Sequence, residues 1–294
     1  MPIPLATVAT QFLDRADLAS STVRSYESTL MPLLQQYGRW PIELLDRTVL
    51  EDYLDGLQQL SYTTHHRHQA ILQALLNFAV ERGYLKANPI IRLRRRKPKA
   101  AKGEHKTDNP IRYLTPEQLE ALYRAVAPDC RMHALTFLLH RSGARIAELL
   151  STNLADLDRD RRRFPVIGKG NKRRWCFYSE DAAEILATYL RFYRDPQSEA
   201  LFTAKHRVSG KVSRLSYSTA HHHWRSLTST DPLLKRIRMH DLRHTFATER
   251  VGLMGIEELR ALMGHQNIQT TLRYQKVTSE RAEAIAHLAF QNLL

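Results

Sequence analysis

The sequence predicts a mainly α protein with two domains: an N-terminal helical bundle, and a mixed, mostly helical domain that contains a small antiparallel β-sheet. The chain has 294 residues, which is enough for two domains that each bury a core. Apolar residues recur at helical spacing along most of the chain. A basic run lies between two such regions, as is typical of a linker. The expected boundaries are 1–92 for the bundle, 93–112 for the linker and 113–294 for the second domain.

The composition indicates a globular protein with a polyanionic partner. Apolar residues make up 43% of the chain and charged residues 25%, while the formal net charge is +14 and the pI is about 10.0. This excess of positive charge favours nucleic acid, with an acidic membrane surface as the alternative. No apolar run approaches the ~20 residues that a membrane-spanning helix needs. The N-terminus has no signal-peptide pattern. We therefore expect a DNA partner and no membrane association.

The sequence offers no pattern that favours a metal or a cofactor. Cys130 and Cys176 are too few and too isolated for a disulfide framework or a zinc cluster, which predicts a reducing, cytoplasmic setting. The three consecutive histidines at 221–223 resemble a metal-binding tract. Consecutive helical residues point in different directions, however, so we do not assign a metal there.

Helical periodicity accounts for the first domain. Residues 23–33 carry one apolar stripe, which follows a serine pair at 20–21 that we expect to cap the helix. Thr48 and Glu51 match a capping box ahead of a second helix. A third stripe covers residues 68–79. Together these stripes predict a small helical bundle.

Basic residues in the bundle and the linker are candidate DNA contacts. Arg67 lies among histidines in the third predicted helix, and the linker begins with a dense run of lysines and arginines. A solvated polar face or tether is the alternative for any single one of them. Between two basic domains, a basic tether is better explained by contact with DNA phosphates. The candidate DNA-binding residues of this region are Arg67, Arg94, Arg95, Arg96 and Lys97.

The second domain opens with a strong helix start. Thr115 is followed by Pro116 at the first helical position and by Gln118, which completes a capping box. Helical periodicity continues to the segment that contains Arg145 and Glu148. These two residues are three apart on a predicted helix, so the carboxylate could orient the guanidinium. An ordinary surface ion pair is the alternative.

Residues 163–178 interrupt the helical pattern and predict a β-hairpin. Two short runs rich in apolar and aromatic residues flank a glycine-rich turn at 168–171. Lys169 is expected at the tip of that turn, where it could reach a ligand. Helices are expected to resume at 180–193 and 217–228, and residues 279–294 form a last amphipathic segment.

The stretch from His240 to Tyr274 offers the imidazoles of His240 and His265, a fixed positive charge and a phenol. His240 and Arg243 are three apart, so one helical turn places them on one face. Tyr274 follows His265 by nine residues, across a short helix that Asn267 could cap. These groups suit attack on a phosphodiester by a phenolate while a positive pocket holds the phosphate. Ordinary structural roles are the alternative for each residue alone.

Five segments of the second domain carry a combined pattern: 143–149, 168–172, 240–244, 264–265 and 271–274. In this order and spacing, they closely resemble the tyrosine recombinase (phage integrase) family, in particular its Xer-like, two-domain members. The resemblance covers the whole second domain, and the first domain through its size and helical character. One departure is Ser142, where many relatives carry threonine.

The resemblance implies a SAM-like core-binding domain, a catalytic domain and a set of residue roles. Arg145 and Arg243 would clamp the non-bridging oxygens of the phosphate, because guanidinium forks make bidentate charged hydrogen bonds. Tyr274 would be the nucleophile, with His240 as the base that activates it.

The same resemblance implies that Lys169 is the general acid for the leaving 5′ oxygen, and that His265 hydrogen-bonds the phosphate. Glu148 would support the pocket from behind, and Lys172 would contact DNA. No metal and no cofactor are needed for these steps.

The implied activity is that of a site-specific DNA recombinase working through a 3′-phosphotyrosine intermediate. Its relatives act as tetramers on two DNA recombination sites, so we expect a homotetramer on DNA, nucleoid association, and a final segment that docks on a neighbouring subunit or packs in place. An accessory or heteromeric partner is compatible with this reading. The alternatives are a type IB-like topoisomerase, a catalytically silent DNA-binding protein and a metal-dependent nuclease.

Overall fold

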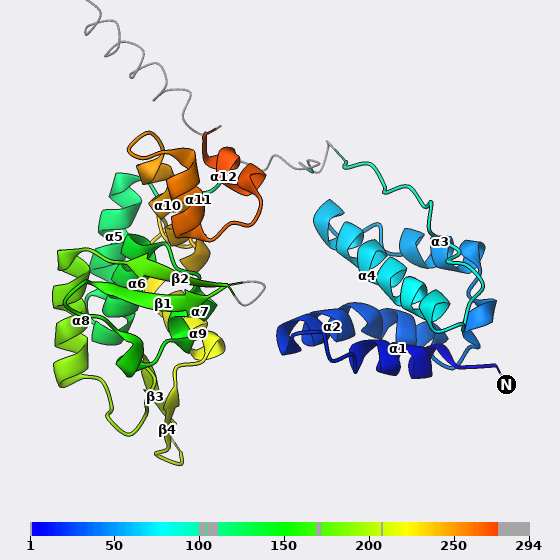
Figure 1. Cartoon of the computed structure of the whole chain (residues 1–294), viewed down its shortest axis with the longest axis horizontal. Coiled ribbons are helices and arrows are strands. Elements are labelled where there is room, and N and C mark those ends of the chain that lie inside the picture. Colours follow the sequence, from blue (N-terminus) through cyan, green and yellow to red (C-terminus); the bar gives the residue numbers. More distant parts are fainter. Residues whose placement is uncertain (1, 100–103, 105–110, 169–171, 207, 276–294) are drawn as a thin grey trace, which may run out of the picture. The chain divides into compact units, whose positions relative to one another are not determined.

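The structure is a computed structural model of the chain that describes residues 2–99, 104, 111–168, 172–206 and 208–275 (Figure 1). The chain divides into two compact units, Met1–Asn109 and Pro110–Leu294. Both units are mainly helical in their described parts, so the predicted fold class is confirmed. Lys169, the tip of the predicted hairpin, and the predicted last segment at 279–294 lie outside the described residues.

The N-terminal unit is a helical bundle in which α1, α2 and α3 each contact the long helix α4. Its apolar core includes Leu5, Phe12, Leu33 and Leu75, all of which are excluded from solvent. The elements are α1 (Leu5–Leu13), α2 (Ser20–Tyr37), the 3-10 helix η1 (Ile42–Leu44), α3 (Arg47–Asp55) and α4 (Tyr62–Glu81).

Two helix starts in this unit differ from the sequence prediction. The N-cap of α3 is Asp46, whose carboxylate accepts a hydrogen bond from the Val49 amide at 2.9 Å. Thr48 therefore lies inside the helix and forms no capping box. The N-cap of α2 is Ala19, which places Ser20 in the first turn instead of before it. In both cases the N-cap lies one or two residues before the predicted cap.

The C-terminal unit is built around α6, which contacts α5, α8, α9 and α10. Seven of eight successive side chains in the middle of α6 are buried, as expected of a central helix. The elements are α5 (Pro116–Val126), α6 (Cys130–Ser142), α7 (Ile146–Ser151), η3 (Leu154–Asp156), β1 (Arg163–Ile167), β2 (Arg173–Phe177), α8 (Glu180–Phe192), β3 (Thr203–Lys205), β4 (Val212–Arg214), α9 (Tyr217–Thr228), α10 (Met239–Arg250), α11 (Ile256–Met263) and α12 (Ile268–Gln275).

Several predicted elements of this unit are confirmed. Thr115 and Gln118 form the reciprocal capping box of α5, with proline at its first turn. Strands β1 and β2 pair antiparallel, with Phe164 opposite Cys176. Helices α8 and α9 cover the two predicted helical segments.

A second antiparallel pair, β3 and β4, was not predicted. Its strands have three residues each, and their sequences lack the apolar alternation that identifies a half-buried strand. The described residues therefore form two separate two-stranded sheets, one of which is the predicted hairpin.

A small apolar cluster joins the last three helices of the described chain. Phe246 of α10, Leu259 and Met263 of α11, and Tyr274 of α12 are all buried in it. Because this cluster fixes α10, α11 and α12 to one another, the side chains that these helices carry keep constant relative positions. Figure 1 shows the three helices grouped at one end of the C-terminal unit.

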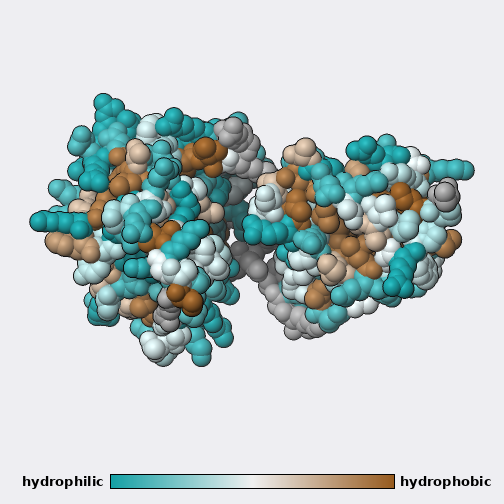
Figure 2. All heavy atoms as spheres, turned by 90° about the horizontal axis from the view of Figure 1, so that it is seen from below, coloured by the Kyte–Doolittle hydropathy of each residue, from teal (hydrophilic) through white to brown (hydrophobic). Residues whose placement is uncertain are grey.

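The face of the surface shown in Figure 2 is largely hydrophilic, since teal, hydrophilic atoms cover much of it and brown apolar areas are smaller. In the described part of the chain, none of the helices combines the length and apolar character needed to cross a bilayer.

Candidate active site

A tight turn between α6 and α7 presents Arg145. Helix α6 ends at Gly143, whose φ of 64° is in the left-handed region that favours glycine. A Cβ at Gly143 would lie 2.5 Å from the ring of Phe246, so α10 also packs too closely for any side chain here. Arg145 then takes an extended conformation as the N-cap of α7. The turn therefore fixes where the Arg145 side chain leaves the backbone.

Ser142 shapes the same turn. Its hydroxyl donates to the Leu138 carbonyl and accepts from the Ala144 amide at 3.3 Å, and its side chain is buried. These contacts need a hydroxyl but make no use of a threonine methyl group. Serine at this position is thus compatible with the geometry of the turn.

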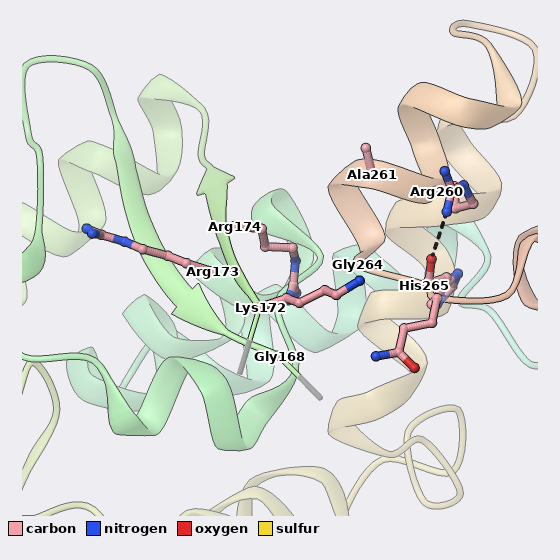
Figure 3. A pocket seen from close by; sticks show the side chains of 9 residues that line it. Gly168, Lys172, Arg173, Arg174, Arg260, Ala261, Gly264 and His265 are labelled. Atoms are coloured by element: carbon pink, nitrogen blue, oxygen red, sulfur yellow. Dashed lines mark hydrogen bonds between the residues drawn. The ribbon is translucent and has the colours of Figure 1, made fainter. Parts of the chain in front are cut away.

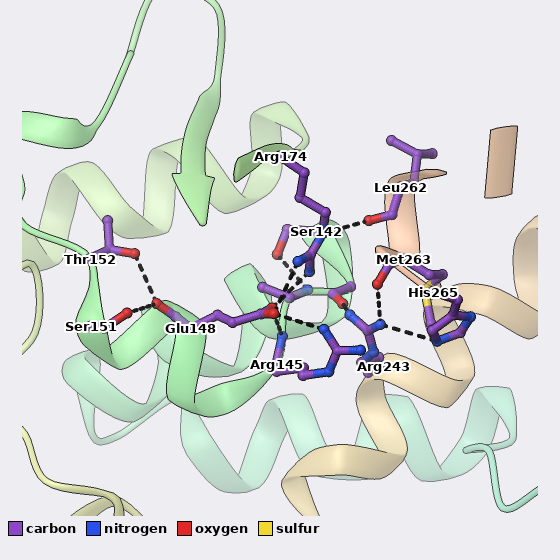
Figure 4. A network of polar contacts seen from close by, with 12 residues as sticks. Ser142, Arg145, Glu148, Ser151, Thr152, Arg174, Arg243, Leu262, Met263 and His265 are labelled. Atoms are coloured by element: carbon purple, nitrogen blue, oxygen red, sulfur yellow. Dashed lines mark hydrogen bonds and ion pairs between the residues drawn. The ribbon is translucent and has the colours of Figure 1, made fainter. Parts of the chain in front are cut away.

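Glu148 binds two arginines at once (Figure 4). Its carboxylate accepts from the Arg145 guanidinium at 2.8 Å and from the Arg145 backbone amide at 2.9 Å. The Arg174 guanidinium forks onto the same carboxylate at 3.0 and 2.7 Å. Burial raises the pKa of Glu148, but the hydrogen bonds from Arg174 and Arg145 outweigh it and hold the pKa at about 2. The carboxylate is therefore charged at neutral pH.

Arg243 is the most buried cation of the site, with 2% of its surface exposed. Its guanidinium donates to the carbonyls of Gly143 and Met263, and its Nη2 lies 3.3 Å from Nε2 of His265 (Figure 4). Burial, together with the nearby charges of Arg145 and Arg174, lowers the pKa of Arg243 to about 10. It remains a cation at neutral pH, inside a pocket that already holds positive charge.

His265 is held as one tautomer. Because an arginine can only donate, Nε2 of His265 must accept from Arg243, and the proton resides on Nδ1. That nitrogen lies 2.9 Å from the hydroxyl of Thr271 in α12. Burial and the adjacent charge of Arg243 lower the pKa of His265 to about 4, so the ring is neutral at pH 7.

The phenol of Tyr274 contacts His244, which was not among the predicted site residues. The Tyr274 hydroxyl lies 2.9 Å from Nδ1 of His244, and the Tyr274 ring stacks on His265 with centroids 6.3 Å apart. Burial raises the pKa of Tyr274, although the charges of Arg243, Arg273 and Arg145 oppose that rise. Burial and the neighbouring His240 lower the pKa of His244 to about 4. A neutral imidazole thus faces a protonated phenol, as proton transfer between them requires.

His240, the predicted base, lies behind His244 and not against the phenol. Its ring meets the His244 ring edge to face, with centroids 4.7 Å apart, and the residue is exposed. Desolvation and the charge of Arg243 lower the pKa of His240. Residues 240 and 244 are separated by one helical turn of α10, so both rings share a face, but of the two it is His244 that contacts Tyr274.

An open pocket borders these residues (Figure 3). It lies between β2 and the end of α11 and has a volume of about 510 Å³. Its lining includes the basic residues and histidine Lys172, Arg173, Arg174, Arg260 and His265. Gly168 and Gly264 also line it and contribute no side chain of their own. Such a basic, concave surface suits the phosphate backbone of a nucleic acid. Lys172 is exposed at this pocket, where the sequence analysis expected a DNA contact.

The candidate DNA contacts of the N-terminal unit fall into two groups. Arg67, Arg94, Arg95 and Lys97 are exposed. Arg96 instead forms a fork onto Glu104 at 2.7 and 2.9 Å and donates to the Leu60 carbonyl at 3.0 Å. Its guanidinium is thereby committed to its own unit.

The histidine tract at 221–223 lies on α9. His223 lies 3.4 Å from a carboxylate oxygen of Asp129. Among the residues that the structure describes, no three histidine, cysteine or acidic side chains are grouped so as to hold a metal ion.

Two site residues were missed by sequence reasoning. His244 is four residues after His240, so the helical spacing alone could have suggested it as an alternative base. Arg174 lies on the predicted hairpin strand, where alternation would place it on the face opposite Trp175 and Arg173. Its pairing with Glu148 links segments 26 residues apart and carries no local signal.

Comparison with known proteins identifies the class. Residues 112–281 match the phage integrase family, and residues 5–94 match the phage integrase SAM-like domain. The first match alone spans more than half of the chain. The chain therefore belongs to the phage integrase family, and it is a tyrosine recombinase with a SAM-like N-terminal domain.

Curated relatives match along almost the whole chain. The tyrosine recombinase XerC of Corynebacterium glutamicum is 28% identical over 299 residues, covering 95% of this chain and 90% of that protein. XerC of Vibrio cholerae serotype O1 is 27% identical over 291 residues, covering 94% and 85%.

Solved structures show the same fold. The Tn1549 transposon integrase in complex with a circular intermediate DNA has a TM-score of 0.71 at 20% identity, covering 92% of this chain and 94% of that one. A lambda integrase dimer bound to a core site has a TM-score of 0.70 at 15% identity, covering 92% and 95%.

Proposed function

We propose that this recombinase cuts and rejoins DNA at specific sites, with Tyr274 as the nucleophile. The observation that carries the proposal is the position of the Tyr274 hydroxyl. It lies 2.9 Å from a neutral imidazole and on a helix packed against the one that carries Arg243. A phenol whose only role was packing would not need a hydrogen-bonded base beside a cluster of guanidinium groups.

In the proposed cleavage step, the Tyr274 oxygen attacks the scissile phosphorus and its proton passes to His244. The bond from phosphorus to the 5′ oxygen breaks, and that oxygen leaves as a hydroxyl after taking up a proton. Lys169 remains the proposed donor of this proton. Arg145 and Arg243 stabilise the charge that grows on the non-bridging oxygens, and His265 adds a hydrogen bond once Arg243 turns to the phosphate and the proton of His265 moves to Nε2. Glu148 holds Arg145 in place.

Rejoining reverses the same steps. The 3′-phosphotyrosine bond is similar in energy to the diester that it replaces, so a 5′ hydroxyl from another strand can attack it without ATP. Exchange between two DNA sites requires several active sites together, and a structure of lambda integrase contains a tetramer bound to a Holliday junction. We propose a homotetramer on DNA, with nucleoid association and with room for an accessory or heteromeric partner. Arg67, Arg94, Arg95, Lys97 and Lys172 are the proposed contacts to the DNA backbone.

A nicked duplex that traps the covalent intermediate tests the proposal. The protein should form an adduct with this DNA that survives a denaturing gel, and Tyr274→Phe should form none while it binds the duplex with nearly unchanged affinity. Tyr178→Phe is the matched control, because Tyr178 is also buried but packs against Phe164 of β1.

An adduct formed by Tyr274→Phe would show that another group is the nucleophile. Loss of both adduct and binding in that variant would mean that Tyr274 is structural. Relaxation of supercoiled DNA by a monomer, without pairing of sites, would favour a type IB-like topoisomerase. Inhibition by EDTA would favour a metal-dependent nuclease.

A further inference from the structure

Arg174 is the residue through which three parts of the site are connected. It lies on β2, and all of its guanidinium nitrogens are engaged. Two of them fork onto Glu148, and Nε donates to the Leu262 carbonyl of α11 at 3.1 Å. Only 11% of its side chain is exposed. Figure 4 shows the guanidinium lying between the Glu148 carboxylate and the end of α11.

The end of α11 receives two arginines. The last carbonyls of a helix have no partner within it and carry partial negative charge. Leu262 gives its carbonyl to Arg174, and the next residue, Met263, gives its carbonyl to Arg243. Two cations from β2 and α10 therefore satisfy neighbouring carbonyls of a single helix terminus, just before His265.

Gly264 lies so close to the Arg174 side chain that there is no room for a side chain of its own. Its φ of 62° ends α11 in the left-handed conformation. A Cβ at this position would lie 2.9 Å from Cδ, Nε and Nη1 of Arg174, closer than side chains approach one another. The chain thus passes directly over the Arg174 side chain on its way to His265.

We propose that Arg174 is a positioning residue. It holds Glu148 at a fixed position relative to the end of α11, which precedes His265. Because Glu148 binds Arg145, Arg174 also fixes the position of the Arg145 guanidinium. This inference rests on the proposed function, because it assigns Arg174 no contact with DNA of its own. The strand that follows the hairpin turn thereby determines where the Arg145 guanidinium can meet the phosphate.

The chemistry of the fork gives the first test. Lysine keeps the charge but cannot fork onto a carboxylate and reach a third acceptor at once. A misplacement of about 1 Å can cost about 10²-fold in rate. We expect Arg174→Lys and Arg174→Met to lower single-turnover cleavage by similar factors of about 10²-fold, with an unchanged salt dependence of DNA binding. If Arg174→Lys cleaves like the wild type, or if either variant lowers the log–log salt slope by ~0.9, Arg174 is a direct phosphate contact and the proposal is wrong.

The second test uses a DNA substrate whose scissile phosphate is neutral. A purely structural defect would lower cleavage of the charged and the neutral substrate equally. A methylphosphonate at the scissile position carries no negative charge, so it depends less on a correctly placed Arg145. The difference between Arg174→Met and wild type should shrink at least about tenfold on this substrate, since the missing stabilisation is electrostatic. An unchanged difference would overturn the proposal.

Arg163→Met is the matched control. Arg163 is also a partly buried arginine of this hairpin, and it pairs with Asp158 at 2.9 Å at the end away from the pocket. It should cleave at the wild-type rate. If Arg174→Met has no thermal unfolding transition, the cleavage rate and the salt slope of Arg174→Lys decide the question.

Arg145→Ala distinguishes failure of the proposed function from failure of this inference. If Arg145→Ala cleaves normally, the proposed phosphate clamp is wrong. If only Arg174→Met cleaves normally, the clamp stands and the positioning role of Arg174 is wrong.

Discussion

At the scale of single residues, the site must place a protonated phenol beside a base that is neutral and able to accept its proton. Tyr274 must give up a proton from a buried position that raises its pKa, so it needs a base that is neutral before the reaction. His244 meets that need because burial and His240 lower its pKa to about 4. Arg243 also lowers the pKa of His244, and it opposes the rise in the pKa of Tyr274. The same cation therefore helps to keep the base neutral and makes the nucleophile easier to deprotonate.

The choice between two histidines is the prediction that belongs to this scale. Only His244 contacts the Tyr274 hydroxyl, so His244→Gln should lower single-turnover cleavage by about 10²- to 10⁴-fold, the usual contribution of a general base. His240→Gln should have the smaller effect, because that ring reaches the phenol only through His244. Cleavage rates on the nicked duplex measure both. A larger loss in His240→Gln would return the role of base to His240, as the sequence analysis expected.

At the scale of elements, the site is assembled from helix ends. Gly143 ends α6 and Gly264 ends α11, both in left-handed conformations, and the chain turns directly into Arg145 and His265. Because the carbonyls at both ends accept from arginines, the helix termini stabilise the cations while the cations satisfy the termini.

Replacement of Gly143 tests this assembly. Gly143→Ala combines left-handed strain with a Cβ 2.5 Å from the Phe246 ring, so we expect the C-terminal unit to lose about 2–4 kcal/mol of unfolding free energy. Gly210→Ala is the control, because its φ is 67° but its nearest neighbour, Lys205 Cε, is 4.0 Å away. That variant should lose only about 1–2 kcal/mol. Equal losses in urea denaturation would mean that the contact with α10 can relax.

The sequence predicts elements well where the signal is local. The capping box at Thr115 and the β1–β2 hairpin are written in adjacent residues, and the structure contains both. The N-cap of α3 shows where such local signals become ambiguous. Both Asp46 and Thr48 are residues that commonly cap helices, and the sequence pattern does not decide between them. The pairing of Arg174 with Glu148 could not be predicted, because it depends on how β2 packs against α7. For the same reason, spacing brings His240 and His244 to one face but cannot decide which of them meets Tyr274.

At the scale of the whole molecule, buried neutral histidines make stability depend on pH. Burial lowers the pKa of both His244 and His265 to about 4, from an ordinary value of 6.5. Between these values the unfolded chain binds protons that the folded chain does not, so stability falls as pH drops from about 6.5 to about 4.

The thermal midpoint of the protein, measured from pH 7.5 to 4, should therefore fall more steeply in the wild type than in a His244→Gln, His265→Gln double variant. Each histidine contributes at most about 1.4 kcal/mol per pH unit in this range. Identical pH profiles would show that both rings protonate in the folded state. Comparison of the two proteins removes the contribution of the carboxyl groups, which they share.

Binding to DNA gives the second prediction at this scale. The net charge of +14 implies that phosphate contacts dominate affinity, so the logarithm of the binding constant should fall linearly with the logarithm of salt concentration, by ~0.9 for each contact. Arg95→Ala should lower this slope by about that amount, because Arg95 is exposed.

Arg96→Ala provides the contrast for the same measurement. Its guanidinium is bound to Glu104 and the Leu60 carbonyl, and it holds the pKa of Glu104 at about 2 together with the Lys99 amide. We expect an unchanged salt slope but a lower thermal midpoint of the N-terminal unit, since Glu104 loses its charged partner and retains the backbone amides of Tyr62 and Lys99. If Arg96→Ala instead lowers the slope as Arg95→Ala does, the arginine must leave Glu104 when DNA binds. A flat response of the wild type to salt would remove the argument from charge altogether.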